Sequence, residues 1–135
     1  MDKNILDASV VIKWFFLEEG SNRADLYLEK LRKREVVIIV PELLFYEVGN
    51  TLRSKKVQEN DSDKIAKQLL GLPFEKKQMD TVYFKKIMHN VGTFDLTFYD
   101  AAYITLMQEE HCEFVTADRK LFETVHKTFT GIKLL

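Results

Sequence analysis

Short apolar runs alternate along the chain with longer stretches in which apolar residues recur at helical spacing. The short runs, rich in branched residues, predict buried strands at 4–8, 36–40, 113–116 and 132–135. The longer stretches predict amphipathic helices at 21–34, 42–57, 62–70, 78–91, 98–111 and 117–128. Strands that alternate with helices indicate an α/β fold with a mostly parallel sheet flanked by helices.

Three local signals predict where helices begin. Ser21 is a plausible cap of the first helix, and Pro41 suits the first turn of the second. The triplet Asn60-Asp61-Ser62 predicts a break in the chain and the cap of the next helix.

Length and composition indicate a globular protein with one domain, residues 1–135, because 46% of the residues are apolar and 30% are charged. The single cysteine, Cys112, excludes an internal disulfide and favours a reducing cytoplasm, and no signal peptide or membrane span is expected. A net charge of −1 argues against broad adhesion to nucleic acid but leaves room for a local groove. The basic run KLRKR at 30–34 is more simply a solvated helix face.

Asp100, within FYDAAYI at 98–104, shares its expected helix face with Tyr103, Ile104 and Met107. Such an apolar face is normally buried, and burying a carboxylate is costly unless a cation or hydrogen-bond donors meet it. A place in the first helical turn suits the helix dipole but does not explain the apolar face.

Two other acids follow expected strands. Asp7 closes the first strand, and Asp118 comes shortly after Thr116, which closes a later one. Parallel strands end at the same edge of a sheet, where the ligand sites of such folds lie. Each aspartate could equally cap the helix that follows, with Ser9 as an alternative cap beside Asp7.

Glu47 falls on the border of the apolar stripe of helix 42–57, close to Asn50. It suits a cleft wall or, equally, an edge position that reaches water. If Asp7, Glu47, Asp100 and Asp118 meet at one rim, they cannot all ionise unless a cation neutralises them. Magnesium or manganese, as one or two ions, is the expected answer, because such hard cations take carboxylate oxygens and keep waters for chemistry.

Four segments resemble the PIN-domain nucleases, and especially the VapC-type ribonuclease toxins, in the same order over essentially the whole chain: ILDASVVIKWF, PELLFYEVGNTL, FYDAAYITL and FVTADRKL. The resemblance implies a three-layer α/β/α sandwich around a mostly parallel sheet. It places the catalytic, metal-binding acids of the family on Asp7, Glu47, Asp100 and Asp118. The small polar residues that support them correspond to Ser9, Thr116 and Asn50.

The resemblance also implies an activity and partners: Mg²⁺- or Mn²⁺-dependent hydrolysis of RNA, with 3′-hydroxyl and 5′-phosphate products. It implies a cytoplasmic homodimer that is silenced by a small antitoxin. The aromatic candidates for such contacts, Trp14, Phe15, Phe16 and Phe45, are more simply explained as core.

Other functions remain open or fit poorly. A PIN-like module that binds RNA without cutting it, or an RNA-processing nuclease that is not a toxin, fits the same residues. A haloacid dehalogenase phosphatase needs an aspartate where this chain has Ser9, and a receiver domain needs an acidic pair that is absent. His89, His111 and His126 lack zinc-like spacing, and Asp95 is expected in a loop.

Overall fold

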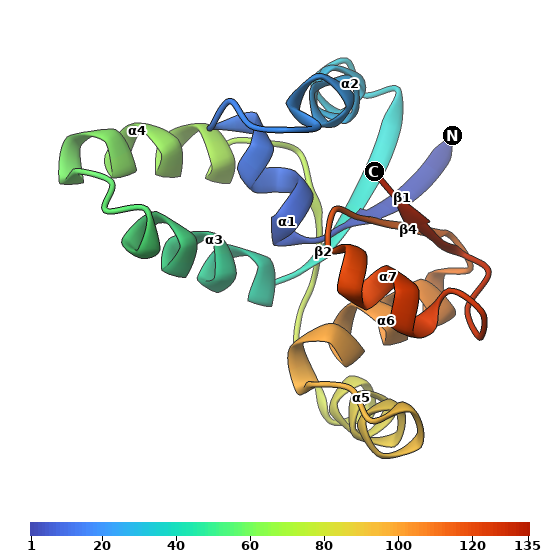
Figure 1. Ribbon diagram of the computed structural model, residues 1–135. Helices are drawn as coiled ribbons and strands as arrows, with labels where there is room; N and C mark the ends of the chain where they lie inside the picture. The colour runs from blue at the N-terminus through green and yellow to red at the C-terminus, as the bar shows by residue number, and fades with distance from the viewer.

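The computed structural model describes the whole chain, residues 1–135, and its strands form one sheet (Figure 1). The strands are β1 (Asp2–Leu6), β2 (Val36–Pro41), β3 (Glu75–Lys77), β4 (Glu113–Thr116) and β5 (Ile132–Leu134). Their spatial order is β3-β2-β1-β4-β5, and every neighbouring pair is parallel. The sheet confirms the expected α/β class and is entirely, rather than mostly, parallel.

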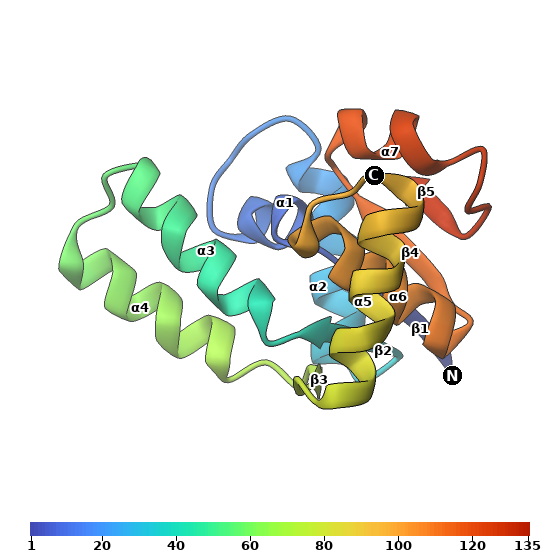
Figure 2. The same ribbon diagram turned by 90° about the horizontal axis from the view of Figure 1, so that it is seen from below.

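Helices cover both faces of this sheet, which gives the expected α/β/α sandwich. They are α1 (Ala8–Val11), which continues into the 3₁₀ turn η1 (Ile12–Trp14), then α2 (Ser21–Arg32), α3 (Leu43–Ser54), α4 (Glu59–Leu70), α5 (Thr81–Phe94), α6 (Phe98–Glu110) and α7 (Arg119–Val125). The helices α3 and α4 form a hairpin that projects away from the sheet (Figures 1 and 2). No helix combines the length and apolar character that crossing a bilayer requires.

Successive strand residues point to opposite faces of the sheet and build two separate cores. Ile5 joins the core beneath α5, α6 and α7, whereas its neighbour Leu6 joins the core beneath α1 to α4. Phe114 and Val115 of β4 divide in the same way. The two cores hold 15 and 13 buried residues, so neither face of the sheet is left to solvent.

The aromatic residues of the N-terminal half belong to the second of these cores. Trp14, Phe15, Phe16 and Phe45 are half-buried and pack against the core under α1 to α4. Phe74 stacks on Trp14, with ring centroids 6.0 Å apart. Their interpretation as core is therefore confirmed.

Two expected helix starts are wrong. Pro41 is the last residue of β2, in register with Lys77 of β3, and α3 begins only at Leu43. A strand end tolerates proline because the missing N–H is least needed there. Ser21 does not cap α2, because Gly20 holds the cap position and the Ser21 hydroxyl instead donates to the Phe16 carbonyl.

The triplet Asn60-Asp61-Ser62 does not break the chain either, since α4 begins at Glu59, directly after Gln58. Other boundaries shift by a few residues: α3 ends at Ser54, α5 spans 81–94, and α7 is shorter than expected. The strand β3 was not expected because its sequence, EKK, has no apolar residue and lies at an edge of the sheet. A single turn such as α1 is too short to show periodicity.

A candidate acidic centre at the carboxyl edge of the sheet

Asp7 lies where β1 ends, with only 7% of its surface exposed. It occupies the cap position of α1, but its side chain caps nothing. Instead, the Ser9 hydroxyl donates a hydrogen bond to one oxygen of the Asp7 carboxylate. The Thr116 hydroxyl donates to the other oxygen, at a distance of 2.5 Å. Burial, and to a smaller extent the charge of Glu47, raise the pKa of Asp7 to about 6 against the lowering effect of these two bonds.

The two hydroxyls also tie the end of β4 to the start of α1. Ser9 accepts a hydrogen bond from the Ala117 N–H at 2.9 Å, and Thr116 accepts one from the Asp118 N–H at 3.0 Å. The exposed Asp118 carboxylate in turn caps α7 by accepting from the Leu121 N–H at 3.1 Å. The interpretation of Asp118 as a helix cap is therefore correct, and capping leaves part of its carboxylate free to bind a ligand.

Glu47 reaches the same region from α3 and is half-buried. The Tyr103 hydroxyl on α6 donates to its Oε1 over 2.6 Å. Burial raises the pKa of Glu47, as does the charge of Asp100, while the tyrosine bond lowers it. Burial and the charge of Glu47 hold the pKa of Tyr103 well above its usual value, so this tyrosine remains a proton donor. The sequence pattern assigned Tyr103 only to the apolar face of its helix. Its position one turn after Asp100 on that face was the one signal that could have indicated a role beside the acids.

Asp100 is half-buried in the first turn of α6, while its face partners Tyr103, Ile104 and Met107 are buried, as expected. The helix cap is Thr97, whose hydroxyl accepts from the Asp100 N–H at 3.1 Å. Burial raises the pKa of Asp100, and so does the charge of Asp118, against the effect of Thr97. The Asp100 carboxylate is thus not needed for capping.

These four carboxylates form one electrostatic group, which we call the acidic centre: Asp7, Glu47, Asp100 and Asp118. The negative charge of Glu47 raises the pKa of Asp7, that of Asp100 raises the pKa of Glu47, and that of Asp118 raises the pKa of Asp100. None of the four forms an ion pair with a lysine, arginine or histidine, because every ion pair in the protein lies elsewhere. The acidic centre therefore concentrates negative charge that no protein cation neutralises.

The donor set of the acidic centre suits a hard divalent cation, since it consists of carboxylate oxygens supported by hydroxyls. No three histidine, cysteine, aspartate or glutamate side chains lie close enough together to hold one ion. That spacing is compatible with magnesium, which usually binds one or two carboxylates directly and keeps several waters.

Asn50 forms no hydrogen bond with any of the four carboxylates. It is exposed and lines, with Glu47, Tyr46 and Tyr99, a cleft of about 390 Å³ beside the acidic centre. Asp95, the acid expected in a loop, ends α5 in a left-handed conformation with φ 53° and is exposed. The loop interpretation of Asp95 is confirmed.

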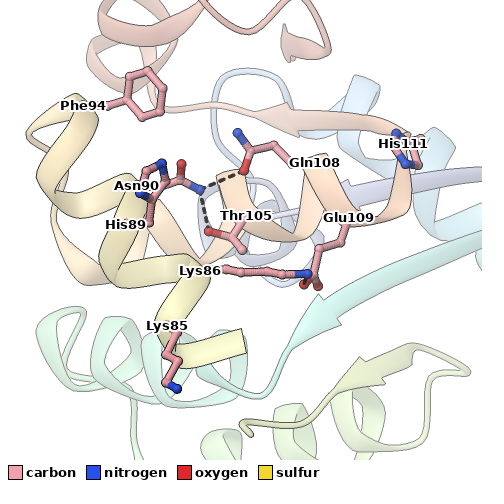
Figure 3. A pocket seen from close by; sticks show the side chains of 9 residues that line it. All are labelled: Lys85, Lys86, His89, Asn90, Phe94, Thr105, Gln108, Glu109 and His111. Carbon is pink, nitrogen blue, oxygen red and sulfur yellow. Dashed lines mark hydrogen bonds and ion pairs between the residues drawn. The ribbon is translucent and has the colours of Figure 1, made fainter. Parts of the chain in front are cut away.

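A hollow of about 750 Å³ lies between α5 and α6 and contains none of the four acids (Figure 3). Several of its polar groups satisfy one another. Asn90 donates to both Thr105 and Gln108 at 2.8 Å, and Lys86 pairs with Glu109 at 2.9 Å. Size alone therefore does not mark the functional site.

The model of the PIN domain family matches residues 5–127, and the chain belongs to this family. The suspected resemblance is thereby confirmed. The PIN domain is a nuclease domain that generally uses divalent metal ions. A comparison with curated proteins gives no match.

Solved structures with the same fold include a toxin and a toxin-antitoxin complex. PAE2754 from Pyrobaculum aerophilum has 21% identity and a TM-score of 0.69, over 97% of this chain and 83% of that one. A toxin-antitoxin complex from Klebsiella pneumoniae has 13% identity and a TM-score of 0.65, over 96% and 95%. VapC20 from Mycobacterium tuberculosis, a toxin that cleaves the sarcin-ricin loop, has 12% identity and a TM-score of 0.69, over 90% and 95%. At these identities the likeness establishes the fold alone.

Proposed function

We propose that this protein is a metal-dependent ribonuclease that hydrolyses RNA phosphodiester bonds at the acidic centre. The observation that carries the proposal is the group of four coupled carboxylates without a protein cation, in a member of a nuclease family. Such a group raises the energy of the metal-free protein and so favours binding of a cation. Residues 1–135 act in this proposal as one domain.

The roles of the residues follow from their contacts. Asp7, Glu47, Asp100 and Asp118 would hold one or two Mg²⁺ or Mn²⁺ ions, directly or through water. When bound, such ions lower the pKa of a coordinated water and offset charge on the scissile phosphate.

The supporting contacts keep the acid side chains in place. Ser9 and Thr116 hold the Asp7 carboxylate in one orientation, and Tyr103 does the same for Glu47. No side chain need act as a nucleophile, and the expected products carry a 3′-hydroxyl and a 5′-phosphate.

Two exposed tyrosines favour a single-stranded substrate. Tyr46 and Tyr99, 77% and 58% exposed, line the cleft that also contains Glu47. Exposed aromatic rings stack unpaired bases without regard to sequence. A base stacked in this cleft would place its neighbouring phosphate close to the acidic centre.

The test is a cleavage assay with the purified protein, a single-stranded RNA and a DNA of the same sequence. We expect RNA to be cut in Mg²⁺ or Mn²⁺, DNA to be left intact, and excess EDTA to stop the reaction. Full activity in EDTA would remove the metal mechanism. RNA that is bound but never cut, under all these conditions, would favour the alternative of a non-cleaving RNA-binding module.

The biological role we propose is that of the toxin in a toxin-antitoxin pair. The similar structures include a toxin-antitoxin complex from Klebsiella pneumoniae and a toxin from Mycobacterium tuberculosis, and this likeness supports the same role here, with a small antitoxin as partner. The homodimer is proposed from the family resemblance alone. Induced expression in bacteria should arrest growth, and co-expression of a short neighbouring gene should relieve the arrest. Active enzyme that leaves growth unchanged would favour an RNA-processing nuclease. Light scattering that shows only monomer at micromolar concentration would contradict the homodimer.

A further inference from the structure

A second, smaller cleft of about 220 Å³ borders the acidic centre and is lined by basic side chains. Lys13, Arg23 and Arg119 line it, with Gly20 and Ala117 between them. Its position is fixed by two neighbours in the chain: Ala117 donates its N–H to Ser9, and Arg119 directly follows Asp118. We call this hollow the basic cleft.

Gly20 brings two of these cationic side chains together. Its φ of 85° is a conformation that side chains with a Cβ rarely adopt. A Cβ at this position would lie 3.4 Å from Nη2 of Arg23 and 3.6 Å from Cε of Lys13. These are ordinary van der Waals distances, so it is the left-handed backbone conformation, and not a lack of space, that favours glycine beside the lysine and the arginine.

Lys13 is held in a fixed position on one side of the basic cleft. Its Nζ pairs with Glu18 at 3.1 Å and donates to the Glu19 carbonyl at 2.6 Å, and its side chain is only 13% exposed. An ammonium group has three N–H donors, so one remains for a ligand.

The two arginines of the basic cleft are exposed and unneutralised. Neither Arg23 nor Arg119 forms an ion pair with any carboxylate, and Glu19 is the one acidic side chain among the lining residues. In a chain of net charge −1, this cleft is thus a local positive site beside a negative one.

We propose that the basic cleft binds a backbone phosphate of the RNA strand, next to the phosphate that is cut at the acidic centre. This inference rests on the proposed ribonuclease function and adds to it the part of the substrate that the cleft recognises. Guanidinium groups bind phosphate through paired hydrogen bonds, and a lysine adds a point charge. The contact fixes the position of the strand without reading its bases. It also offsets the repulsion between the acidic centre and a polyanion.

The experiment compares Arg23→Gln, Arg119→Gln and the double variant with Arg32→Gln. Arg32 is a matched control because it lies at the other end of α2, exposed, without an ion pair and outside the cleft. Binding of a single-stranded RNA is measured at several salt concentrations in an Asp100→Asn background, so that the RNA stays intact. Circular dichroism checks that each variant is folded.

We expect each cleft variant to weaken RNA binding about tenfold, as the loss of a charged hydrogen bond implies. The double variant should also reduce the slope of log K against log salt by about 0.7, the value for one phosphate contact on a single strand. In the active protein, KM should rise while kcat stays nearly constant. Arg32→Gln should change none of these quantities.

Provided that the wild-type protein cleaves RNA, two results overturn the inference and leave the nuclease function intact. In the first, the cleft variants bind RNA with unchanged affinity and salt slope. In the second, Arg32→Gln loses as much RNA affinity as the cleft variants do. The second result would show a diffuse attraction rather than a site. Wild-type protein that neither binds nor cuts single-stranded RNA would remove the proposed function together with the basic cleft.

Discussion

The acidic centre and the hollow between α5 and α6 are both polar, yet they differ in how their charges are satisfied. In the hollow, Asn90 is hydrogen-bonded by two partners and Lys86 is paired with Glu109 (Figure 3). In the acidic centre, hydroxyls and N–H groups orient the carboxylates, but no cation meets them. The hollow is larger than the cleft beside the acidic centre, and its buried amide and its lysine–glutamate pair already have partners within the protein.

The difference indicates that unneutralised charge, rather than volume, marks the functional site. A polar network that is complete within the protein stabilises the fold and has little left to offer a ligand. Carboxylates with raised pKa values, held in place by neutral donors, gain most from an added cation.

The largest expected effect is the loss of cleavage in Asp7→Asn or Asp100→Asn. Each change keeps the shape of the side chain and removes a ligand charge worth several kcal/mol, so single-turnover cleavage should fall about 10³-fold or more. Asp95→Asn is the control, because this exposed residue has a left-handed conformation that asparagine tolerates. Undiminished cleavage in both Asp7→Asn and Asp100→Asn would remove the acidic centre from the mechanism.

The second effect is a decrease in stability of the metal-free protein as pH rises. In the folded protein the pKa of Asp7 is about 6, above its ordinary value of 3.8, so the folded state binds the Asp7 proton more tightly than the unfolded state does. The resulting contribution to folding stability is fully present below about pH 4 and is lost as pH rises through 6. The difference between the two pKa values corresponds to about 3 kcal/mol. The raised pKa values of Glu47 and Asp100 act with the same sign.

Urea unfolding in EDTA at pH 4.5 and pH 7 measures this loss. Asp7→Asn should flatten the pH dependence, whereas Asp95→Asn should retain it, and added Mg²⁺ should stabilise the wild type at pH 7. If wild type and Asp7→Asn show identical pH profiles of stability, Asp7 is not the source of the pH dependence.

A smaller effect is expected at the hydroxyl that joins two parts of the acidic centre. Thr116→Val keeps the volume but removes the donor to Asp7 and the acceptor for the Asp118 N–H. Loss of such a support typically lowers activity 10- to 100-fold, so we expect kcat in Mg²⁺ to fall by about that factor. Thr116→Ser should retain most activity. Thr124→Val, on the exposed side of α7, is the control, and an equal loss there would indicate a general effect on the fold.

The smallest effect is expected in the hollow between α5 and α6. Lys86→Gln breaks an exposed ion pair with Glu109 and should cost about 0.5 kcal/mol of stability, with cleavage unchanged. His89→Gln, at another wall of the hollow, should behave in the same way. A tenfold loss of cleavage in either variant would show that the hollow, like the acidic centre, takes part in the reaction.

Local patterns predicted those elements whose own residues dictate them. The run VVIIV and the stretch 98–111 became β2 and α6 because their apolar residues are buried in the two cores on the sheet. The rule that parallel strands end at one edge also placed Asp7 and Asp118 near each other. The roles of these acids in catalysis stay predictions.

Features that depend on distant contacts were not accessible from local patterns. The three charged residues of β3 form a strand only because the edge of β2 offers hydrogen bonds. Tyr103 supports Glu47 across 56 positions of sequence, and a tyrosine on an apolar face otherwise indicates core. Ser9 and Thr116 were assigned as supports only through family resemblance, because the strand pairing that joins them is not visible in the sequence.

The bond between Thr116 and Asp7 spans 109 positions, and β4 pairs directly with β1 at the centre of the sheet. A nascent chain on the ribosome therefore carries Asp7 long before Thr116, which orients it, has been made. Until β4 emerges, β1 has one unpaired side and the acids from the two ends of the chain remain apart. Pairing of β4 with β1 and assembly of the acidic centre therefore occur together, late in translation.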